Sequence, residues 1–247
     1  MVLRITYSGL FFCLVVTLAA AQASAPSPDV STIVQRMMTA QQDNKARLHP
    51  FTVKRGYFLM DKKDEPKSEV VAHITVLPPD NKQYWIESSS GGGMGEKVLR
   101  DVLTKETEPA KDSQRKELSP ENYDFQLSGE ESLDGRRCFV LAMNPRRDDK
   151  DLIRGKVWVD AQSYNVRRIE GSPVKSPSWW LRDVHILMNF AEVDGMWLRT
   201  FTQAVANVRF KGKYVLEARD LEYRTVSQTT ARRHGNPGIL AGAVINP

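Results

Sequence analysis

The sequence contains little cysteine. Only two occur among 247 residues: Cys13 lies in an N-terminal apolar run, and Cys138 lies in an apolar stretch that ends at Leu141. If the N-terminal run is removed on export, the one remaining cysteine excludes an intramolecular disulfide. The chain does not need one, because a domain of more than ~150 residues buries most of its unfolded surface. The apolar neighbours of Cys138 predict a buried structural thiol.

Motifs of known catalytic and cofactor sites are also missing. The sequence has no Gly-x-Ser-x-Gly elbow and no His-Glu-x-x-His zinc motif. The stretch from Gly91 to Lys97 lacks the Gly-Lys-Ser/Thr of a phosphate-binding loop and is more typical of a hinge before a helix. The four histidines lie far apart, without a second ligand at metal spacing; they are His49, His73, His185 and His234.

These absences predict no metal, no cofactor and no enzyme activity. A hydrolase stays open as an alternative, because active sites can assemble from residues that are distant in sequence. It would depend on a carboxylate or on His185.

Charge of one sign is not concentrated in any segment. The formal net charge is +5, and basic pairs such as Arg146-Arg147 lie beside acids such as Asp148-Asp149. A nucleic-acid-binding surface would be more one-sided, so we predict no nucleic-acid partner. A mildly basic face could help the protein dock on an anionic membrane, with an ordinary solvated surface as the alternative.

The one long apolar run is at the N-terminus. Arg4 precedes an apolar segment from Leu10 to Ala20, and Ala21-Gln22-Ala23 supplies small residues at the spacing of a cleavage site. The run is shorter than the ~20 residues of a membrane span. Residues 1–23 are therefore predicted to be a cleaved signal peptide, and the mature chain to be exported.

Two amphipathic helices are predicted. The first starts with Ser27 as N-cap and Pro28 at the first helical position, and it ends near Leu48. The second covers Glu96–Lys105. The segment Ser88–Gly95 before it is predicted to be flexible, and the charged segment Lys105–Glu117 after it to be a mobile loop.

The rest of the chain alternates as antiparallel strands separated by polar turns. In Phe51–Met60 the residues Phe51, Val53, Tyr57 and Leu59 share one face, and Asp134-Gly135 indicates a hairpin. The whole of Gly155–Tyr223 is dense in β-branched and aromatic residues.

We predict a single α+β domain over residues 24–227, mainly antiparallel β, followed by a disordered tail over 228–247. Nine to eleven strands in one sheet are too many to stay flat. The expected architecture is therefore a half-open curved β-barrel with the two helices as a lid.

Adjacent tryptophans occupy a Pro/Ser-rich turn at Trp179-Trp180. They cannot both pack on one face of a sheet. One of them could border an opening, or both could pack beneath the adjoining loop; the sequence favours neither alternative.

Two passages resemble a known family. The first, residues 73–87 (HITVLPPDNKQYWIE), is similar to the strand–Pro–Asn–x–x–Trp passage of periplasmic lipoprotein carriers of the LolA/LolB type. The second, residues 155–171 (GKVWVDAQSYNVRRIEG), is similar to the Trp-x-Asp hairpin of the same carriers and of the related MucB/RseB sensor domains. The resemblance implies a periplasmic, incomplete β-barrel whose apolar cavity takes up acyl chains. The chain departs from it at Leu77 and Pro78, where LolA-type carriers have a basic residue directly before the proline that corresponds to Pro79.

From patterning and resemblance together we expect a monomeric, non-enzymatic carrier of lipid or lipoprotein acyl chains, with a membrane-associated donor or acceptor protein as a further partner. The alternative is a MucB/RseB-like envelope-stress sensor module that binds a membrane regulator. The expected apolar lining comes from alternating strand positions and consists of Val53, Tyr57, Leu59, Ile74, Val76, Trp85, Trp158 and Trp197.

Overall fold

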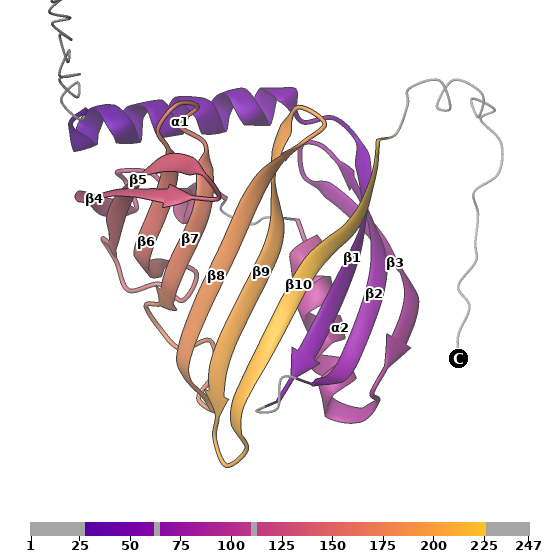
Figure 1. The fold of residues 1–247 in the computed structure, drawn as a ribbon. Helices are drawn as coiled ribbons and strands as arrows, with labels where there is room; N and C mark the ends of the chain where they lie inside the picture. The colour runs from indigo at the N-terminus through magenta and orange to yellow at the C-terminus, as the bar shows by residue number, and fades with distance from the viewer. Residues whose placement is uncertain (1–27, 62–64, 110–112, 226–247) are drawn as a thin grey trace, which may run out of the picture.

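The computed structural model describes residues 28–61, 65–109 and 113–225. These residues form two α-helices, a short 3₁₀ helix and ten strands. Figure 1 shows how the labelled helices and strands are arranged. The predicted signal peptide (1–23) and tail (228–247) lie outside the described residues. In chain order the elements are α1 (Val30–Arg47), β1 (Phe51–Met60), β2 (Pro66–Leu77), β3 (Asn81–Ser90), α2 (Gly93–Thr107), η1 (Ser113–Lys116), β4 (Tyr123–Leu133), β5 (Arg136–Pro145), β6 (Ile153–Asp160), β7 (Val166–Pro173), β8 (Leu181–Val193), β9 (Met196–Val208) and β10 (Gly212–Thr225).

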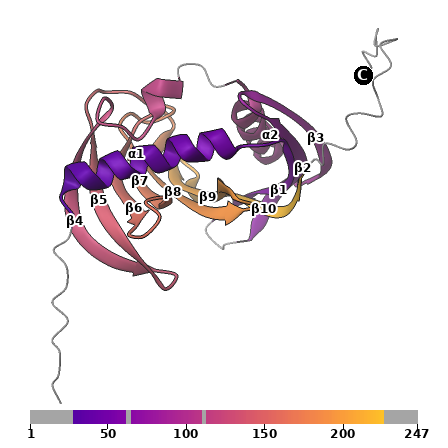
Figure 2. The same ribbon diagram turned by 90° about the horizontal axis from the view of Figure 1, so that it is seen from above.

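The ten strands form one antiparallel sheet in the order β3-β2-β1-β10-β9-β8-β7-β6-β5-β4. Seen from above, the sheet bends from β4 round to β3, with α2 inside the bend of β1–β3 (Figure 2). In the part of the chain that is described, β3 and β4 are the two edges, so the barrel is open. The predicted half-open curved barrel with two helices is confirmed.

The start of α1 differs from the prediction. Asp29, not Ser27, is the N-cap: its carboxylate accepts hydrogen bonds from the Thr32 amide (2.8 Å) and the Ser31 hydroxyl (2.6 Å). Asp is as good an N-cap as Ser, and its carboxylate also interacts favourably with the helix dipole.

The region around α2 is more ordered than predicted. Ser88–Ser90 pair with β2 as the end of β3, and α2 begins at Gly93 instead of Glu96. Gly91 makes this tight connection, because its φ is +90° and a Cβ there would lie 2.1 Å from the Lys67 carbonyl oxygen. The predicted loop after Lys105 contains the last turn of α2 and the helix η1.

The strand register shows that both helices cover the same face. Directly opposite residues of neighbouring strands point to the same side, so one continuous row can be followed across eight strands. From β5 to β2 it runs Leu141, Val157, Ile169, Met188, Thr202, Ala218, Tyr57 and Val70. We call this side the inner face and the opposite side the outward face.

Two separate cores cover the two ends of this row. At one end Ile33, Val34 and Met37 of α1 pack on β5–β7, together with Leu141 and others. At the other end Leu99 and Leu103 of α2 pack on β1 and β2. Cys138 is buried in a small cluster of its own, which confirms the predicted structural thiol, and this burial raises its pKa.

Two glycines allow a close approach of β6 and β7. Gly155 and Gly171 lie directly opposite one another. A Cβ on Gly155 would lie 2.0 Å from the Glu170 carbonyl oxygen, and one on Gly171 would lie 2.3 Å from that of Arg154. Glycines at such positions mark sharp bends in barrel-like sheets.

Candidate ligand-binding site

The inner face is left partly uncovered between the two cores. Met188 and Thr202 at the centre of the row are half-buried, whereas Leu141 and Tyr57 nearer its ends are fully buried. The neighbouring inner positions of β8–β10 are half-buried as well. Together with Met188 they form an apolar set that we call the central strip: Ile186, Met188, Ala204, Ala206, Tyr214 and Leu216.

The central strip belongs only marginally to the two cores. Met188 touches the edge of the core under α1, and Leu216 touches the edge of the core under α2. Among the described residues, Ile186, Ala204 and Tyr214 are part of neither core. An apolar surface that curves and is only partly covered can take up a flexible apolar ligand.

Five of the eight predicted lining residues are brought together, but beneath α2. Val53, Tyr57 and Ile74 are buried against α2, and Leu59 and Val76 pack at the border of the same core. The strand alternation therefore placed these five on one and the same face, which is the inner face. Because α2 already fills the space over Val53, Tyr57 and Ile74, they contribute to a packed core in this state of the protein.

The three predicted tryptophans lie elsewhere, so the expected single lining is corrected. Trp85 is 56% exposed on the outward face, where it stacks on His73 with ring centroids 4.1 Å apart. Trp158 is also on the outward face, in the cluster with Cys138, and its indole N–H donates to Glu131 (2.8 Å).

Trp197, in β9, lies beside the C-terminal end of α1. Its indole N–H donates to the Val166 carbonyl (2.6 Å), and it borders a polar cavity of about 270 Å³ that includes Asp43, Asn44 and Glu192. The central strip was missed as a lining, although the alternation Ile186, Met188, Phe190 was the signal that could have revealed it.

A buried group of charges fixes α2 in place. Glu106 of α2 forms ion pairs with Arg55 of β1 and with Arg199 of β9, the latter at 2.7 Å. The Tyr57 hydroxyl donates to the second oxygen of Glu106 (2.8 Å). We call Glu106, Arg55, Arg199 and Tyr57, together with Asp220, which also pairs with Arg55, the Glu106 cluster.

The Glu106 cluster is electrostatically balanced. Burial alone would raise the pKa of Glu106, but the Arg199 and Arg55 guanidiniums and the Tyr57 hydroxyl hold it below its ordinary value. Burial and the Glu106 charge raise the pKa of Tyr57, which stays a neutral hydrogen-bond donor. Buried ion pairs contribute little net stability, but removing one partner leaves an uncompensated charge.

Helix α1 is also fixed at both ends. Near its C-terminus the Asn44 side chain donates to the Trp197 carbonyl (2.8 Å) and accepts from the Trp197 amide (2.6 Å). Near its N-terminus Arg36 donates to the Tyr164 hydroxyl (3.1 Å) and lies over its ring. With both helices in these positions, the central strip is left partly uncovered.

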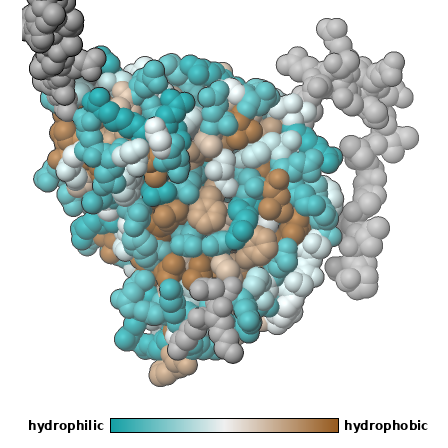
Figure 3. Space-filling view, viewed as in Figure 1, coloured by the Kyte–Doolittle hydropathy of each residue, from teal (hydrophilic) through white to brown (hydrophobic). Residues whose placement is uncertain are grey.

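The outward face has a mixed character. In Figure 1 β10 and β1 pass in front of α2, so the view is onto this face. Figure 3 shows apolar side chains over its middle, separated by hydrophilic ones. Arg219 lies over the Phe58 ring there, and His185 lies 3.0 Å from Glu170.

No group of three or more His, Cys, Asp or Glu residues within the described ranges is placed to hold a metal ion. None of the helices in these ranges is long and apolar enough to cross a lipid bilayer.

Comparison with known proteins finds similarity only among solved structures. No family model matches the chain, and no curated protein matches it. The chain is similar to a LolA superfamily protein from Nitrosomonas europaea, with 14% identity, 80% of this chain and 93% of that chain covered, and a TM-score of 0.40. It is also similar to a DUF1329 family protein from Desulfovibrio piger, with 12% identity, coverage of 81% and 95%, and a TM-score of 0.41.

A third similar structure is the MucA/MucB complex of Pseudomonas aeruginosa, with 11% identity, coverage of 80% and 99%, and a TM-score of 0.27. The classes that the two sequence passages resemble are thus found among the similar structures. At these scores the likenesses carry no argument about function, and the fold assignment rests on the strand order and register described above.

Proposed function

We propose that this protein is a non-enzymatic, periplasmic carrier that holds the acyl chains of a lipid or lipoprotein against the central strip. The observation that carries the proposal is the uncovered apolar part of the inner face between two fixed helices. The resemblance of the two sequence passages and the predicted signal peptide agree with it.

The free energy gained by burying acyl chains indicates how many chains the ligand has. Each buried CH₂ contributes about 0.8 kcal/mol, so ten methylenes of one chain contribute about 8 kcal/mol. Association itself costs roughly 4–15 kcal/mol. One short chain therefore binds weakly, and a ligand with two or three chains is favoured.

Neighbouring residues of β8 supply a matched test. Ile186 and Leu187 are both half-buried but point to opposite faces, because adjacent strand residues alternate. We expect Ile186→Asn to weaken binding of a fluorescent fatty acyl probe at least about fivefold, since it places an amide in the central strip. Leu187→Asn is the control and leaves probe binding unchanged.

The proposal fails if the probe does not bind the unsubstituted protein, or if the two variants affect binding equally. Circular dichroism of both variants establishes that each is folded. A hydrolase would instead release free fatty acid from ester substrates, which chromatography of the same incubations detects.

A further inference from the structure

Three large aromatic side chains protrude from one end of the molecule. Phe210 is 97% exposed, Trp179 is 77% exposed and Trp180 is 37% exposed. They come from two loops, residues 174–180 between β7 and β8 and residues 209–211 between β9 and β10, which we call the tip loops. Exposed aromatics on this scale are unusual for a purely solvated surface.

The tip loops are held together by specific contacts. The Arg209 amide donates to the Trp180 carbonyl (2.9 Å), and the Arg209 guanidinium lies over the Trp179 ring at 5.5 Å. The Ser176 hydroxyl donates to the carbonyls of Ser178 and Leu181, each at 2.8 Å. The exposed positions of the two tryptophans therefore belong to an organised surface, and the exposure of Trp179 excludes the alternative in which both pack beneath the loop.

Phe210 occupies a strained position. Its φ is +66°, a left-handed conformation that bulky residues rarely adopt. The Lys211 amide closes the turn by donating to the Val208 carbonyl (3.0 Å). Strained backbone positions cluster at functional sites, and this one holds an aromatic ring almost entirely in solvent.

The aromatics are surrounded by positive charge. Segments 175–183 and 207–213 contain five basic residues and one acidic residue, Asp183, which accepts a hydrogen bond from Asn207 (3.0 Å). Beside Phe210 a shallow hollow of about 460 Å³ is bordered by Arg182 and Arg209. The basic residues are all exposed: Lys175, Arg182, Arg209, Lys211 and Lys213.

We propose that the tip loops dock the protein on the surface of an anionic lipid bilayer. Tryptophan favours the interface between headgroups and acyl chains. Phe210 would enter the outer acyl region, and the basic residues would bind anionic headgroups, with the two guanidiniums of the hollow facing a phosphate. Protruding aromatics ringed by cations suit a fluid surface that deforms around them better than a flat protein partner.

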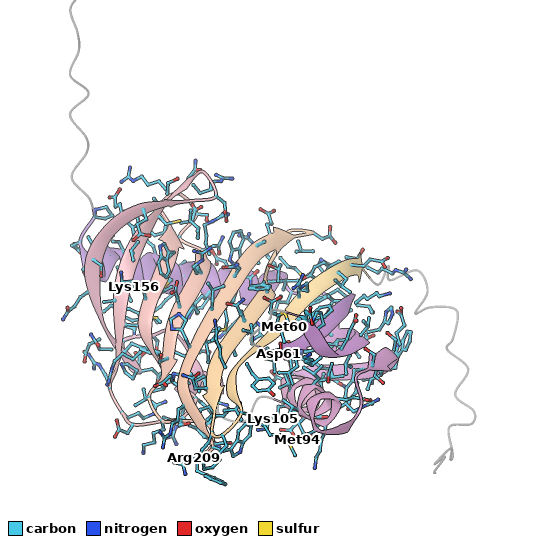
Figure 4. All side chains as sticks on the ribbon, turned by 60° about the horizontal axis from the view of Figure 1, so that its bottom comes forward. Met60, Asp61, Met94, Lys105, Lys156 and Arg209 are labelled. Atoms are coloured by element: carbon cyan, nitrogen blue, oxygen red, sulfur yellow. The ribbon has the colours of Figure 1, made fainter. Side chains whose placement is uncertain are left out.

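This docking would bring the end of the molecule that carries the N-terminus of α2 to the membrane. Figure 4 shows Arg209 at the end of the β9–β10 hairpin and Met94 of α2 at the same end of the molecule. Met94 is itself 71% exposed. The proposal stands without the carrier function, because the tip loops are separate from the central strip.

The test uses protein purified from the periplasm of an expressing bacterium and mixed with vesicles of phosphatidylglycerol or of phosphatidylcholine. Sedimentation measures the partition coefficient. We expect stronger binding to the anionic vesicles. The triple variant Trp179→Ser, Trp180→Ser, Phe210→Ser lowers it at least about tenfold, and Arg209→Gln with Lys211→Gln lowers it about tenfold on anionic vesicles alone.

Two controls make the test decisive. Trp85→Ser removes an exposed tryptophan from the outward face and leaves partition unchanged. Trp179→Phe with Trp180→Phe keeps partition but loses most of the fluorescence quenching by brominated lipid, because the quenched rings are gone. The proposal is overturned if the protein binds neither vesicle, if the triple variant partitions like the unsubstituted protein, or if the tip loops instead determine self-association in gel filtration.

Discussion

Glu106 illustrates how one buried carboxylate organises the contact between a helix and a sheet. Its two oxygens face Arg55, Arg199 and Tyr57, which come from two strands that are distant in sequence. Replacing Glu106 with Gln keeps the shape but leaves the guanidinium of Arg55 buried without this counter-charge. We expect Glu106→Gln to lower the free energy of unfolding by about 3 kcal/mol, measured by urea denaturation.

The control for this substitution is Glu96→Gln in the same helix. Glu96 pairs with Arg100 at 2.7 Å on the surface, and exposed pairs of this kind have little effect on stability. The importance of the Glu106 cluster would be refuted by equal urea midpoints for the two variants.

The pKa of Glu106 predicts a specific dependence of stability on pH. It is lowered in the folded protein from its ordinary value of 4.5. The unfolded chain therefore binds the proton more readily, so the contribution of Glu106 is fully present above about pH 4.5 and is lost as the pH falls through the folded pKa. Stability measured between pH 6 and pH 3 should fall less steeply in Glu106→Gln than in the unsubstituted protein; parallel curves would contradict this.

Single residues also show what the sequence could predict about the site. Val53, Tyr57 and Leu59 follow the period of two and lie on the predicted face, whereas Arg55, between them in the same alternation, was overlooked because its charge conceals its burial. Trp85 and Trp158 were assigned to the wrong face. A shift of one residue reverses the direction of every side chain in a strand, and the bulge between Val71 and Ala72 changes the pairing of β2 with β3.

At the scale of elements, α2 depends on a small apolar contact with the sheet. Leu103 is completely buried against β1 and β2. We expect Leu103→Ala to lower the free energy of unfolding by about 2–5 kcal/mol, because it leaves a cavity in this core. Met94→Ala, at an exposed position in the same helix, should change the thermal midpoint very little. Calorimetry of both variants measures the two midpoints, and equal midpoints would contradict the prediction.

The sequence predicted the elements well but not how the two helices bind the sheet. Hydrophobic periodicity identified both helices and most of the antiparallel strands, since these signals are local. The pairing of β1 with β10 joins residues more than 150 positions apart, and the Asn44–Trp197 contact is equally distant. Contacts of this range depend on register, which no local pattern specifies.

At the scale of the whole molecule, the two cores leave the centre of a curved sheet uncovered. Here the central positions are occupied by small and medium residues such as Ala204, Ala206 and Ile186, half-buried and facing the inside of the bend. A bound acyl chain would remove the apolar area of these positions from water.

The same reasoning predicts the effect of filling the strip from within. Ala204 lies opposite Ile186 and Leu216, so Ala204→Trp places a large apolar group in the uncovered space. We expect it to reduce acyl-probe binding at least about tenfold while keeping or raising the thermal midpoint, since apolar area is buried. A variant that binds the probe normally would show that the strip is not the site.

We propose above that acyl chains occupy the inner face. Native mass spectrometry of protein purified from a Gram-negative periplasm measures most directly whether they do. We expect extra mass that matches a lipid or lipoprotein with two or three acyl chains, lost on organic extraction and regained on incubation with lipid. Protein that is consistently free of ligand, and that gains no mass when lipid is supplied, would contradict it.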